Sequence, residues 1–256
     1  MLTTSQVQAY LSRIGVGEVP CANDEMLGIL QYAHLQTVPY ENLDILAGKP
    51  ISLKLDDLFA KIVTEHRGGF CFELNRLFGE LLRALGYEVT DYVARYWRGE
   101  TAVPHRRHQV LRVKTCEGHE FLCDVGVGAV IPLWPVPYVV GEICDQQGVE
   151  YALREDPTFG KVLTERYEDG WRDVYSFNED VQLPCDYEYP CFWCEHAPNS
   201  PFRAGFMLAI RKGNVRHTFD GPVYKIFAEN TVTAMELSEL ERNAILSEVF
   251  GLDVGL

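Results

Sequence analysis

The stretch EHRGGFCFELN, residues 65–75, places a cysteine between a glycine-containing turn and the start of a helical pattern. The apolar residues that follow recur at the spacing of one helix face, and Gly86 ends the pattern as a C-terminal stop. We therefore predict a core-facing helix over 71–85. The unpaired N–H groups and positive dipole end of its first turn favour a thiolate, so Cys71 is a candidate nucleophile. The alternative is a small buried apolar residue, the commoner fate of a free cysteine.

The rest of residues 1–86 is also helical in pattern. Ser5 is the expected cap of the first helix and Asn23 that of the second, because short polar side chains accept from the free N–H groups of a first turn. Three further helices are predicted here, over 5–15, 23–38 and 54–65. Together with the cysteine helix they indicate a helical N-terminal bundle.

From Tyr87 the pattern changes to short β-rich runs separated by Gly, Pro and Asn or Asp. Such runs predict a β-barrel or a meander in the middle of the chain. The predicted strands are 88–97, 108–115, 120–128, 137–144, 149–155, 161–168 and 172–177.

The last part of the chain returns to mixed structure. Strands are predicted over 205–213, 215–221 and 223–230, followed by a helix over 235–251. The expected apolar stripe of that helix is Leu237, Leu240, Ala244, Leu246 and Val249.

Composition narrows the class of protein. With 47% hydrophobic residues the chain can form real cores, and disorder is not expected. Its 23 basic and 37 acidic residues give a net charge of −14, which argues against partners such as nucleic acid or an anionic membrane surface. No stretch reads as a signal peptide or a membrane span, so we expect a cytoplasmic protein whose partners are small molecules.

The eight cysteines are scattered through the chain, which favours free thiols in a reducing compartment over a disulfide framework. The segment CDYEYPCFWCEH, residues 185–196, gathers several potential zinc ligands. Only one pair in it has the C-x₂-C spacing, whereas a structural zinc site usually joins two such halves. We therefore expect no metal at the set formed by Cys185, Cys191, Cys194 and His196.

A catalytic thiol needs a base, and the base needs an orienting acid. His108 begins one predicted strand and Asp124 lies on the next. The two side chains share a sheet face only if the connecting loop has an odd number of residues. Even then we expect an offset along the ladder of about four residues, roughly 13 Å, which a bulge or a bend would have to close.

Taken together, these segments resemble the arylamine N-acetyltransferase family in order and spacing. YLSRIG (10–15) resembles the opening helix of that family, and VPYENLDIL (38–46) its P-F-E-N-L-D segment. The matching site segments are RGGFCFELN (67–75) for the cysteine signature, RRHQVLRV (106–113) for the histidine strand and DVGVG (124–128) for the D-V-G-F-G loop.

The resemblance implies an α+β fold: a helical N-terminal bundle, a central β-barrel and a C-terminal α/β lid. The corresponding domains are 1–86, 87–190 and 191–256. It also implies a Cys-His-Asp core of the kind found in papain-like proteases and transglutaminases, with Cys71 as nucleophile, His108 as base and Asp124 as orienting acid.

The implied reaction takes acetyl-CoA as co-substrate. Cys71, ionised by pairing with the His108 imidazolium, would accept the acetyl group as a thioester, and an arylamine or hydrazine would then remove it in a ping-pong cycle. Gly126 and Gly128 would allow the backbone to approach CoA closely. Arg107 is a further candidate contact to the cofactor, because it belongs to a local basic group with Arg95, Arg98 and Arg106 that could meet the CoA phosphates. The resemblance places Tyr40, Phe70, Tyr96, Val127 and Phe202 at the acceptor.

The chain departs from the family mainly in the acceptor pocket. Val127 stands where the family commonly has Phe, Arg107 where it has Thr, and EHAP (195–198) where it has STHP. We expect the activity class to survive these changes, and the acceptor preference to differ.

Three other functions stay open. An amide synthase of the same fold would load a larger acyl group, and a cysteine amidase or protease would use the same three residues. A non-enzymatic binding protein on a degenerate fold is the third, and the intact Cys71, His108 and Asp124 speak against it.

Overall fold

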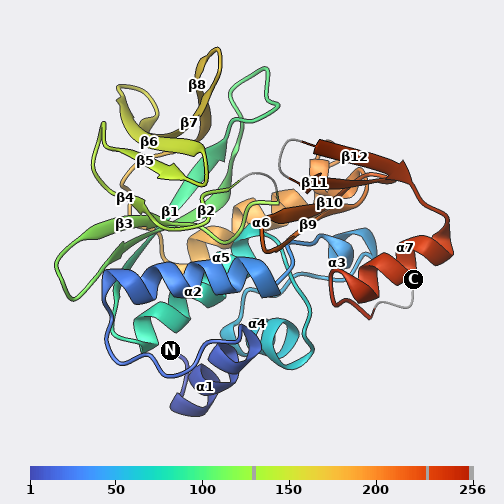
Figure 1. Cartoon of the computed structure of the whole chain (residues 1–256), viewed down its shortest axis with the longest axis horizontal. Helices are drawn as coiled ribbons and strands as arrows, with labels where there is room; N and C mark the ends of the chain where they lie inside the picture. The colour runs from blue at the N-terminus through green and yellow to red at the C-terminus, as the bar shows by residue number, and fades with distance from the viewer. Residues whose placement is uncertain (129–130, 229–230, 254–256) are drawn as a thin grey trace.

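The computed structural model describes residues 1–128, 131–228 and 231–253, and Figure 1 shows their course. The N-terminal part is helical, as predicted. Its elements are α1 Thr4–Arg13, α2 Asp24–Thr37, α3 Leu43–Leu46, α4 Leu55–Phe59, the π-helical turn η1 Ala60–Thr64 and α5 Cys71–Ala84.

Two helix starts show how caps decide the boundaries. The predicted cap Asn23 accepts from the backbone N–H of Met26 at 3.0 Å. The predicted cap Ser5 is wrong, because Thr3 accepts from the backbone of Gln6 and so starts α1 two residues earlier. Gln6 also accepts from the Thr3 backbone N–H, so the two residues cap each other.

Helix α5 is the centre of the N-terminal core, and its predicted bounds are confirmed to within one residue. Most of its side chains are buried, polar ones included. Other helices cover α5 on one side, and strands β1 (Glu88–Tyr96) and β2 (Arg106–Lys114) cover it on the other. Gly86 follows it with φ +96°, a left-handed conformation that suits glycine at a helix C-terminus.

The middle of the chain forms an eight-stranded, nearly closed barrel-like sheet in the order β4-β3-β2-β1-β8-β7-β6-β5. Neighbouring strands of this sheet run antiparallel. The two edges approach each other where the Gln146 side chain donates to the Trp134 carbonyl at 2.9 Å and accepts from its N–H at 3.1 Å. The strands are β1 Glu88–Tyr96, β2 Arg106–Lys114, β3 Glu120–Cys123, β4 Val136–Pro137, β5 Ile143–Gln146, β6 Val149–Asp156, β7 Gly160–Tyr167 and β8 Gly170–Phe177.

Two strand predictions need correction. The run 120–128 is a strand only to Cys123, because the chain turns there towards α5 and its next residues bond to α5 side chains. The run 137–144 is not one strand: a turn with Gly141 at φ +82° separates β4 from β5.

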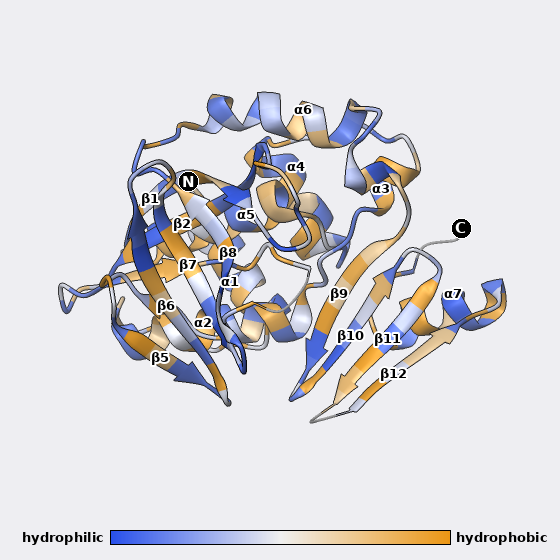
Figure 2. Ribbon diagram, turned by 90° about the horizontal axis from the view of Figure 1, so that it is seen from above, coloured by the Kyte–Doolittle hydropathy of each residue, from blue (hydrophilic) through white to orange (hydrophobic). Residues whose placement is uncertain are grey.

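The C-terminal part combines short helices with a second sheet. Its elements are η2 Pro184–Tyr187, α6 Glu188–His196, η3 Pro201–Arg203, β9 Met207–Lys212, β10 Val215–Asp220, β11 Val223–Ala228, β12 Thr231–Glu236 and α7 Glu239–Glu248. The sheet is antiparallel in the order β12-β11-β10-β9. Figure 2 shows α7 on the outer side of this sheet, with the barrel strands across the molecule from it.

Helix α6 and strand β12 are absent from the sequence prediction, and the predicted helix 235–251 starts too early. Ser238 caps α7, accepting from the backbone of Glu241, so Met235 and Glu236 remain in β12. Within the predicted stripe Leu240 and Ala244 are exposed, whereas Leu246 is buried beside Phe250. Leu237 and Val249 pack against the same cluster, so three of the five predicted stripe residues face the core and the other two do not.

Buried residues gather in three clusters: one around α5, one inside the barrel, and one between the C-terminal sheet and α7. The proposed boundary between 190 and 191 lies within α6, whose buried cysteines pack in the α5 cluster. The division into three domains stays a prediction. Among the described residues no helix has the length and apolar character needed to cross a bilayer.

Candidate active site

A cavity of about 360 Å³ lies between α5, the barrel and the C-terminal sheet. One side, the α5 wall, presents Cys71, Arg107, His108 and Gly126. The opposite side, the C-terminal wall, presents Met207, Arg216, Thr218, Asp220, Lys225 and Phe227. The α5 wall contains residues expected from the sequence, and none of the C-terminal wall was expected.

Cys71 is the first residue of α5, so its thiol lies beside the helix N-terminus as predicted. It is only 2% exposed, and its Sγ lies 3.6 Å from the Arg107 carbonyl oxygen, to which it donates. Glu73 accepts from the backbone N–H of Phe70 at 3.1 Å and so satisfies a free donor of the first turn.

An ionic network holds the turn before Cys71. Lys61 pairs with Glu73 and with Asp44, both at 2.7 Å. Arg67 pairs with Glu41 at 2.7 Å and with Asp44 at 3.1 Å. Because Glu41 and Glu73 are buried, each needs its cation to offset the loss of water. The network explains why charged residues surround the cysteine turn.

The paired glycines of the same turn are required by close packing. A Cβ at Gly68 would lie 1.9 Å from the Pro39 carbonyl oxygen, and one at Gly69 would lie 2.7 Å from a Glu73 carboxylate oxygen. Neither glycine has room for a side chain. The RGG pattern thus serves the approach of this turn to the segment that carries Tyr40.

His108 and Asp124 are in direct contact, with Nε2 and Oδ2 2.7 Å apart and both side chains buried. The connection 115–119 between β2 and β3 has an odd number of residues, which meets the sequence condition for a shared face. Leu111 pairs with Cys123 in the ladder. Asp124 therefore lies about two residues along the ladder from His108, roughly 7 Å, and the predicted offset of four is wrong.

A bulge completes this geometry. Ala94 pairs with His108 but Arg95 pairs with Arg106, so Arg107 is an extra residue in β2. Bulges re-aim side chains and carbonyls, and here the Arg107 carbonyl faces the Cys71 sulfur. With Nε2 of His108 engaged by Asp124, Nδ1 is the ring nitrogen left to exchange a proton with a neighbour.

Asn75 is a site residue that the sequence analysis missed. Its amide donates to Asp124 Oδ1 at 2.8 Å and to the Gln109 carbonyl at 2.7 Å, and its oxygen accepts from the Val125 N–H at 2.9 Å. It thereby ties α5 to both barrel segments of the site. The signal was its position one helical turn after Cys71, on the same face.

The carboxylate of Asp124 is fully engaged. Its Oδ1 accepts from Asn75 and from the backbone N–H of Gly126 at 2.8 Å each, and its Oδ2 contacts His108. Three partners in a buried setting fix the orientation of the carboxylate and therefore of the imidazole.

The pKa of the Cys71 thiol departs in the direction opposite to the one expected. Burial raises it well above its ordinary value, and the nearby Cys194 and Asp124 raise it further. The Gln109 backbone hydrogen bond and Arg107 lower it without reversing the direction. The sequence argument counted the helix terminus and an imidazolium, and it had no means of weighing the loss of water around the sulfur.

Gly126 and Gly128 line the cavity, and both are crowded by protein atoms. A Cβ at Gly126 would lie 2.6 Å from the Cys71 Cα and 2.6 Å from the Asn75 amide nitrogen. One at Gly128 would lie 2.5 Å from the Tyr40 ring. The need for glycine at both positions therefore arises from packing within the protein, and the predicted contact with a cofactor stays a prediction.

Four of the five predicted acceptor residues line the cavity: Tyr40, Tyr96, Val127 and Phe202. Phe70 does not line it. Its ring is completely buried and makes edge contacts with Phe202 at 5.3 Å and with Phe72 at 5.5 Å. Phe70 thus supports the position of Phe202 from behind.

The four predicted arginines divide into two groups. Arg98 and Arg107 line the cavity, where Arg98 pairs with Glu165 and Arg107 with Glu100. The others lie outside it: Arg95 donates to the Pro104 carbonyl, and Arg106 pairs with Asp180 at 3.9 Å. Of these four arginines, only Arg98 and Arg107 bring positive charge to the cavity.

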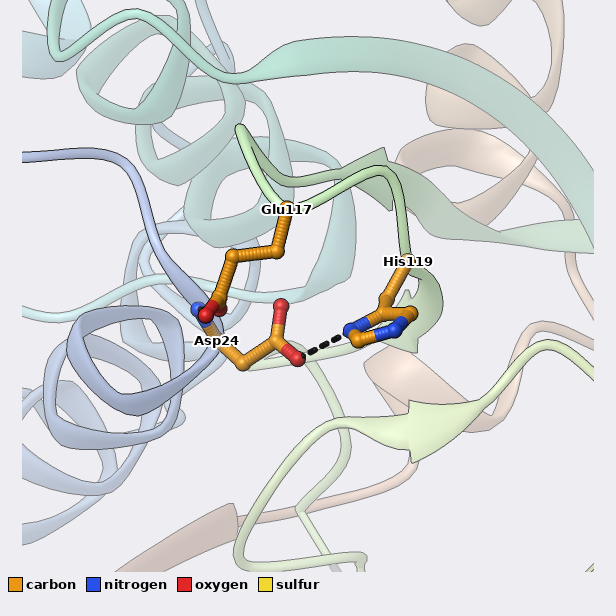
Figure 3. A group of neighbouring side chains, drawn as sticks. All are labelled: Asp24, Glu117 and His119. Atoms are coloured by element: carbon orange, nitrogen blue, oxygen red, sulfur yellow. Dashed lines mark hydrogen bonds and ion pairs between the residues drawn. The ribbon is translucent and has the colours of Figure 1, made fainter.

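The four potential zinc ligands of residues 185–196 do not lie together. Cys191 and Cys194 are buried on the inner side of α6, whereas Cys185 and His196 are exposed. Within the described ranges, three potential metal ligands converge only at Asp24, Glu117 and His119, shown in Figure 3.

The Asp24 cluster has a structural explanation. Asp24 is the first residue of α2; its N–H donates to Glu117 at 2.9 Å, and its carboxylate contacts Thr115 and His119 at 2.6 Å each. These bonds fasten the β2–β3 connection to the N-terminus of α2, as Figure 3 shows for His119.

Known proteins resemble this chain in sequence and in overall fold. A family model described as N-acetyltransferase matches residues 25–256. The arylamine N-acetyltransferase / N-hydroxyarylamine O-acetyltransferase of Salmonella typhimurium is 33% identical over 85% of this chain and 75% of its own. Proansamycin X synthase of Amycolatopsis mediterranei is 32% identical over 71% of each.

Among solved structures, that of Mycobacterium marinum arylamine N-acetyltransferase in complex with CoA has a TM-score of 0.89. It is 29% identical in sequence and matches 96% of this chain and 92% of its own. The mixed helix and sheet architecture is thus that of known N-acetyltransferase structures.

Proposed function

The chain belongs to the arylamine N-acetyltransferase family, and we propose that it moves an acetyl group from acetyl-CoA, through a thioester on Cys71, to an arylamine or hydrazine nitrogen. The observation that carries the proposal is the α5 wall, where Cys71 and His108 line one cavity and His108 contacts Asp124 at 2.7 Å. The triad would be Cys71, His108 and Asp124.

In the first half-reaction the Cys71 sulfur attacks the acetyl carbonyl carbon as His108 takes the thiol proton. The carbon–sulfur bond to CoA then breaks, and CoA leaves as a thiol with that proton. Burial disfavours an isolated thiolate at Cys71, so the negative charge forms together with the imidazolium, and the pair stays neutral overall. Asp124 orients the ring and stabilises its positive charge.

In the second half-reaction the acceptor nitrogen attacks the thioester carbon and His108 removes its proton. The bond to Cys71 breaks, and the proton returns to the sulfur, which restores the enzyme. Backbone N–H groups in the first turn of α5 are the proposed donors to the developing oxyanion. Since CoA leaves before the amine enters, double-reciprocal plots are expected to be parallel.

The acceptor would lie among Tyr40, Tyr96, Val127 and Phe202, which give the cavity aromatic and apolar surfaces beside the thiol. CoA would approach past Gly126, Gly128 and Arg107. The complex of the Mycobacterium marinum enzyme with CoA supports CoA as the carrier in this family.

An amide synthase is the second candidate function, because one relative of similar identity is proansamycin X synthase. A synthase would load a larger acyl group on Cys71 and release it by attack of an amine within the same acyl chain. An amidase or protease would release the acyl group to water.

Intact-mass analysis after mixing with acetyl-CoA tests the proposal. We expect a mass increase of one acetyl group in the wild type, its loss on adding an arylamine, and none in Cys71→Ala. Longer acyl thioesters and a peptide ester, tested in parallel, separate the synthase and the protease. Acetylation of Cys71→Ala at the wild-type level, or faster loading from the longer thioesters, would overturn the acetyltransferase proposal.

A further inference from the structure

The C-terminal sheet has two faces of different character. On the face against α7, Leu208, Phe219 and Tyr224 are buried in an apolar cluster. Because side chains alternate along strands, the intervening residues point the other way, towards the cavity. They include two arginines, Arg211 on β9 and Arg216 on β10, which are directly opposite each other in the ladder.

Like charges directly opposite across a strand pair repel each other, and burial adds to the cost. Burial lowers the pKa of both arginines, that of Arg216 to about 10, and each arginine neighbours other cations or tyrosines. The Arg216 guanidinium lies 3.8 Å from the centre of the Phe227 ring, which holds it flat against the sheet.

Within the part of the chain that the structure describes, neither arginine forms an ion pair. The carboxylates that line the cavity have other partners: Asp220 pairs with Lys225 at 2.9 Å and Glu100 pairs with Arg107. The Nε of Arg211 is buried without a hydrogen-bond partner. Two guanidinium groups therefore lie beside a cavity in which the carboxylates of the described lining residues, Glu100 and Asp220, are each already paired with another cation.

That space adjoins the proposed reaction centre. Arg216 lines the cavity that contains Cys71. Arg211 and Arg216 together line a smaller adjoining cavity, beside Tyr40 and Val127. A group held by the arginines would thus belong to a molecule that also reaches the thiol.

We propose that Arg211 and Arg216 bind an oxyanion carried by a substrate of the acetyl transfer. The inference rests on the proposed function for the identity of the substrates, and the chemistry of the pair defines the group: an oxyanion with two oxygens that accept paired hydrogen bonds from a guanidinium group. It comes from one of two sources, a carboxylate on the arylamine or a phosphate of the acetyl donor.

The test uses Arg211→Gln and Arg216→Gln, with Arg172→Gln as the matched control, because Arg172 is an exposed arginine paired with Asp169 in a barrel hairpin. In the acceptor arm, kcat/KM for 4-aminobenzoate is divided by that for the neutral 4-aminobenzamide. In the donor arm, the rate of Cys71 acetylation by acetyl-CoA is divided by that for S-acetyl-N-acetylcysteamine, which has no phosphate.

We expect one ratio to fall by about 10- to 100-fold in both cavity variants, as loss of a charge-assisted hydrogen bond predicts, and to stay unchanged in the control. A fall in the acceptor ratio identifies the carboxylate, and a fall in the donor ratio the phosphate. If both ratios stay within twofold of the wild type in both variants, the proposal is wrong.

A binding measurement separates this inference from the proposed function. Cys71→Ala protein, which cannot form the thioester, is heated with and without inorganic phosphate and 4-aminobenzoate. At least one anion should raise its melting temperature, and Cys71→Ala/Arg216→Gln should lose that gain. Without anions, Arg216→Gln should melt no lower than the wild type, because the substitution removes a repulsion. Arg216→Lys keeps the positive charge but loses the paired N–H donors of the guanidinium group. It should therefore recover only part of the rise in melting temperature that the anion causes.

Discussion

The two walls of the cavity treat buried charge in opposite ways. Behind the α5 wall three buried carboxylates are matched: Asp124 has three partners, Glu73 pairs with Lys61, and Glu41 pairs with Arg67. On the C-terminal wall Arg216 and its neighbour Arg211 form no ion pair among the described residues. Matched groups hold a geometry, whereas unmatched groups are available to a ligand.

The same difference separates the residues that fix the geometry of the nucleophile from those that could select the substrate. Satisfied buried networks fix side chains in one arrangement, which a positioned nucleophile needs. An unmatched cation in a cavity lowers the stability of the folded protein, and binding an anion relieves this cost. Such a cation can therefore favour substrates that carry a negative charge. Substitutions on the α5 wall should therefore reduce all turnover, and those facing the C-terminal wall should change preference.

The largest effect is expected from Asp124→Asn. The amide would keep the shape of the side chain, remove the charge that stabilises the imidazolium and favour the wrong tautomer of His108, for a loss of about 10⁴ in turnover. Stopped-flow acetylation and steady-state kinetics measure it, with circular dichroism as the check on folding. Activity within tenfold of the wild type would show that Asp124 is only structural and that turnover does not depend on the geometry behind the α5 wall.

Gly126→Ala tests how tightly the same wall is packed. The new methyl would meet the Cys71 Cα and the Asn75 amide at 2.6 Å, so the loop must move, and a displacement of about 1 Å at a nucleophile costs roughly 100-fold. Gly17→Ala is the control, because a Cβ there meets nothing within 4 Å. If the two variants are equally active, crowding at Gly126 does not position the thiol.

Val127→Phe tests the boundary between the walls, where Val127 faces both cavities. An added aromatic face contributes about 0.5 to 1.5 kcal/mol to a stacked ligand, up to about tenfold in affinity. We expect kcat/KM to rise for aniline and to fall for a bulky amine. A change in the same direction for both acceptors would exclude Val127 as the determinant of acceptor size.

The smallest effect concerns pH. Burial raises the pKa of the Glu73 carboxyl from 4.5 to about 7, even though Lys61 lowers it. The folded state therefore holds this proton more tightly than the unfolded state. The resulting stability is complete below about pH 4.5 and is lost as the pH rises through about 7.

Glu73→Gln should remove this slope. The melting temperature of the variant, relative to that of the wild type, should rise by a few degrees between pH 5 and pH 8. A change of 1 kcal/mol in the free energy of unfolding corresponds to about 2 to 4 °C. Comparing the two proteins at each pH cancels other groups, such as the buried His34, whose lowered pKa acts in the opposite direction. The exposed Glu155→Gln is the control, and a constant difference across the range would contradict the assignment.

The sequence predicted what local patterns encode. The periodicity after Cys71 predicted α5 to within a residue, and the alternating runs predicted most barrel strands. The odd loop length and a bulge at the start of β2 were stated as conditions for contact between His108 and Asp124, and both occur. Helix α6 escaped prediction because its cysteines and aromatics show no clear stripe.

By itself the sequence determined that Cys71 begins a core helix and that the chain resembles a family with a known reaction, because helix periodicity and ordered motifs are properties of neighbouring residues. Only the tertiary structure decided the environment of that cysteine and the second wall of its cavity. Burial raises the pKa of Cys71, and antiparallel register sets Arg211 against Arg216. Both effects depend on which distant segments exclude water or share a sheet face, and no local pattern records that.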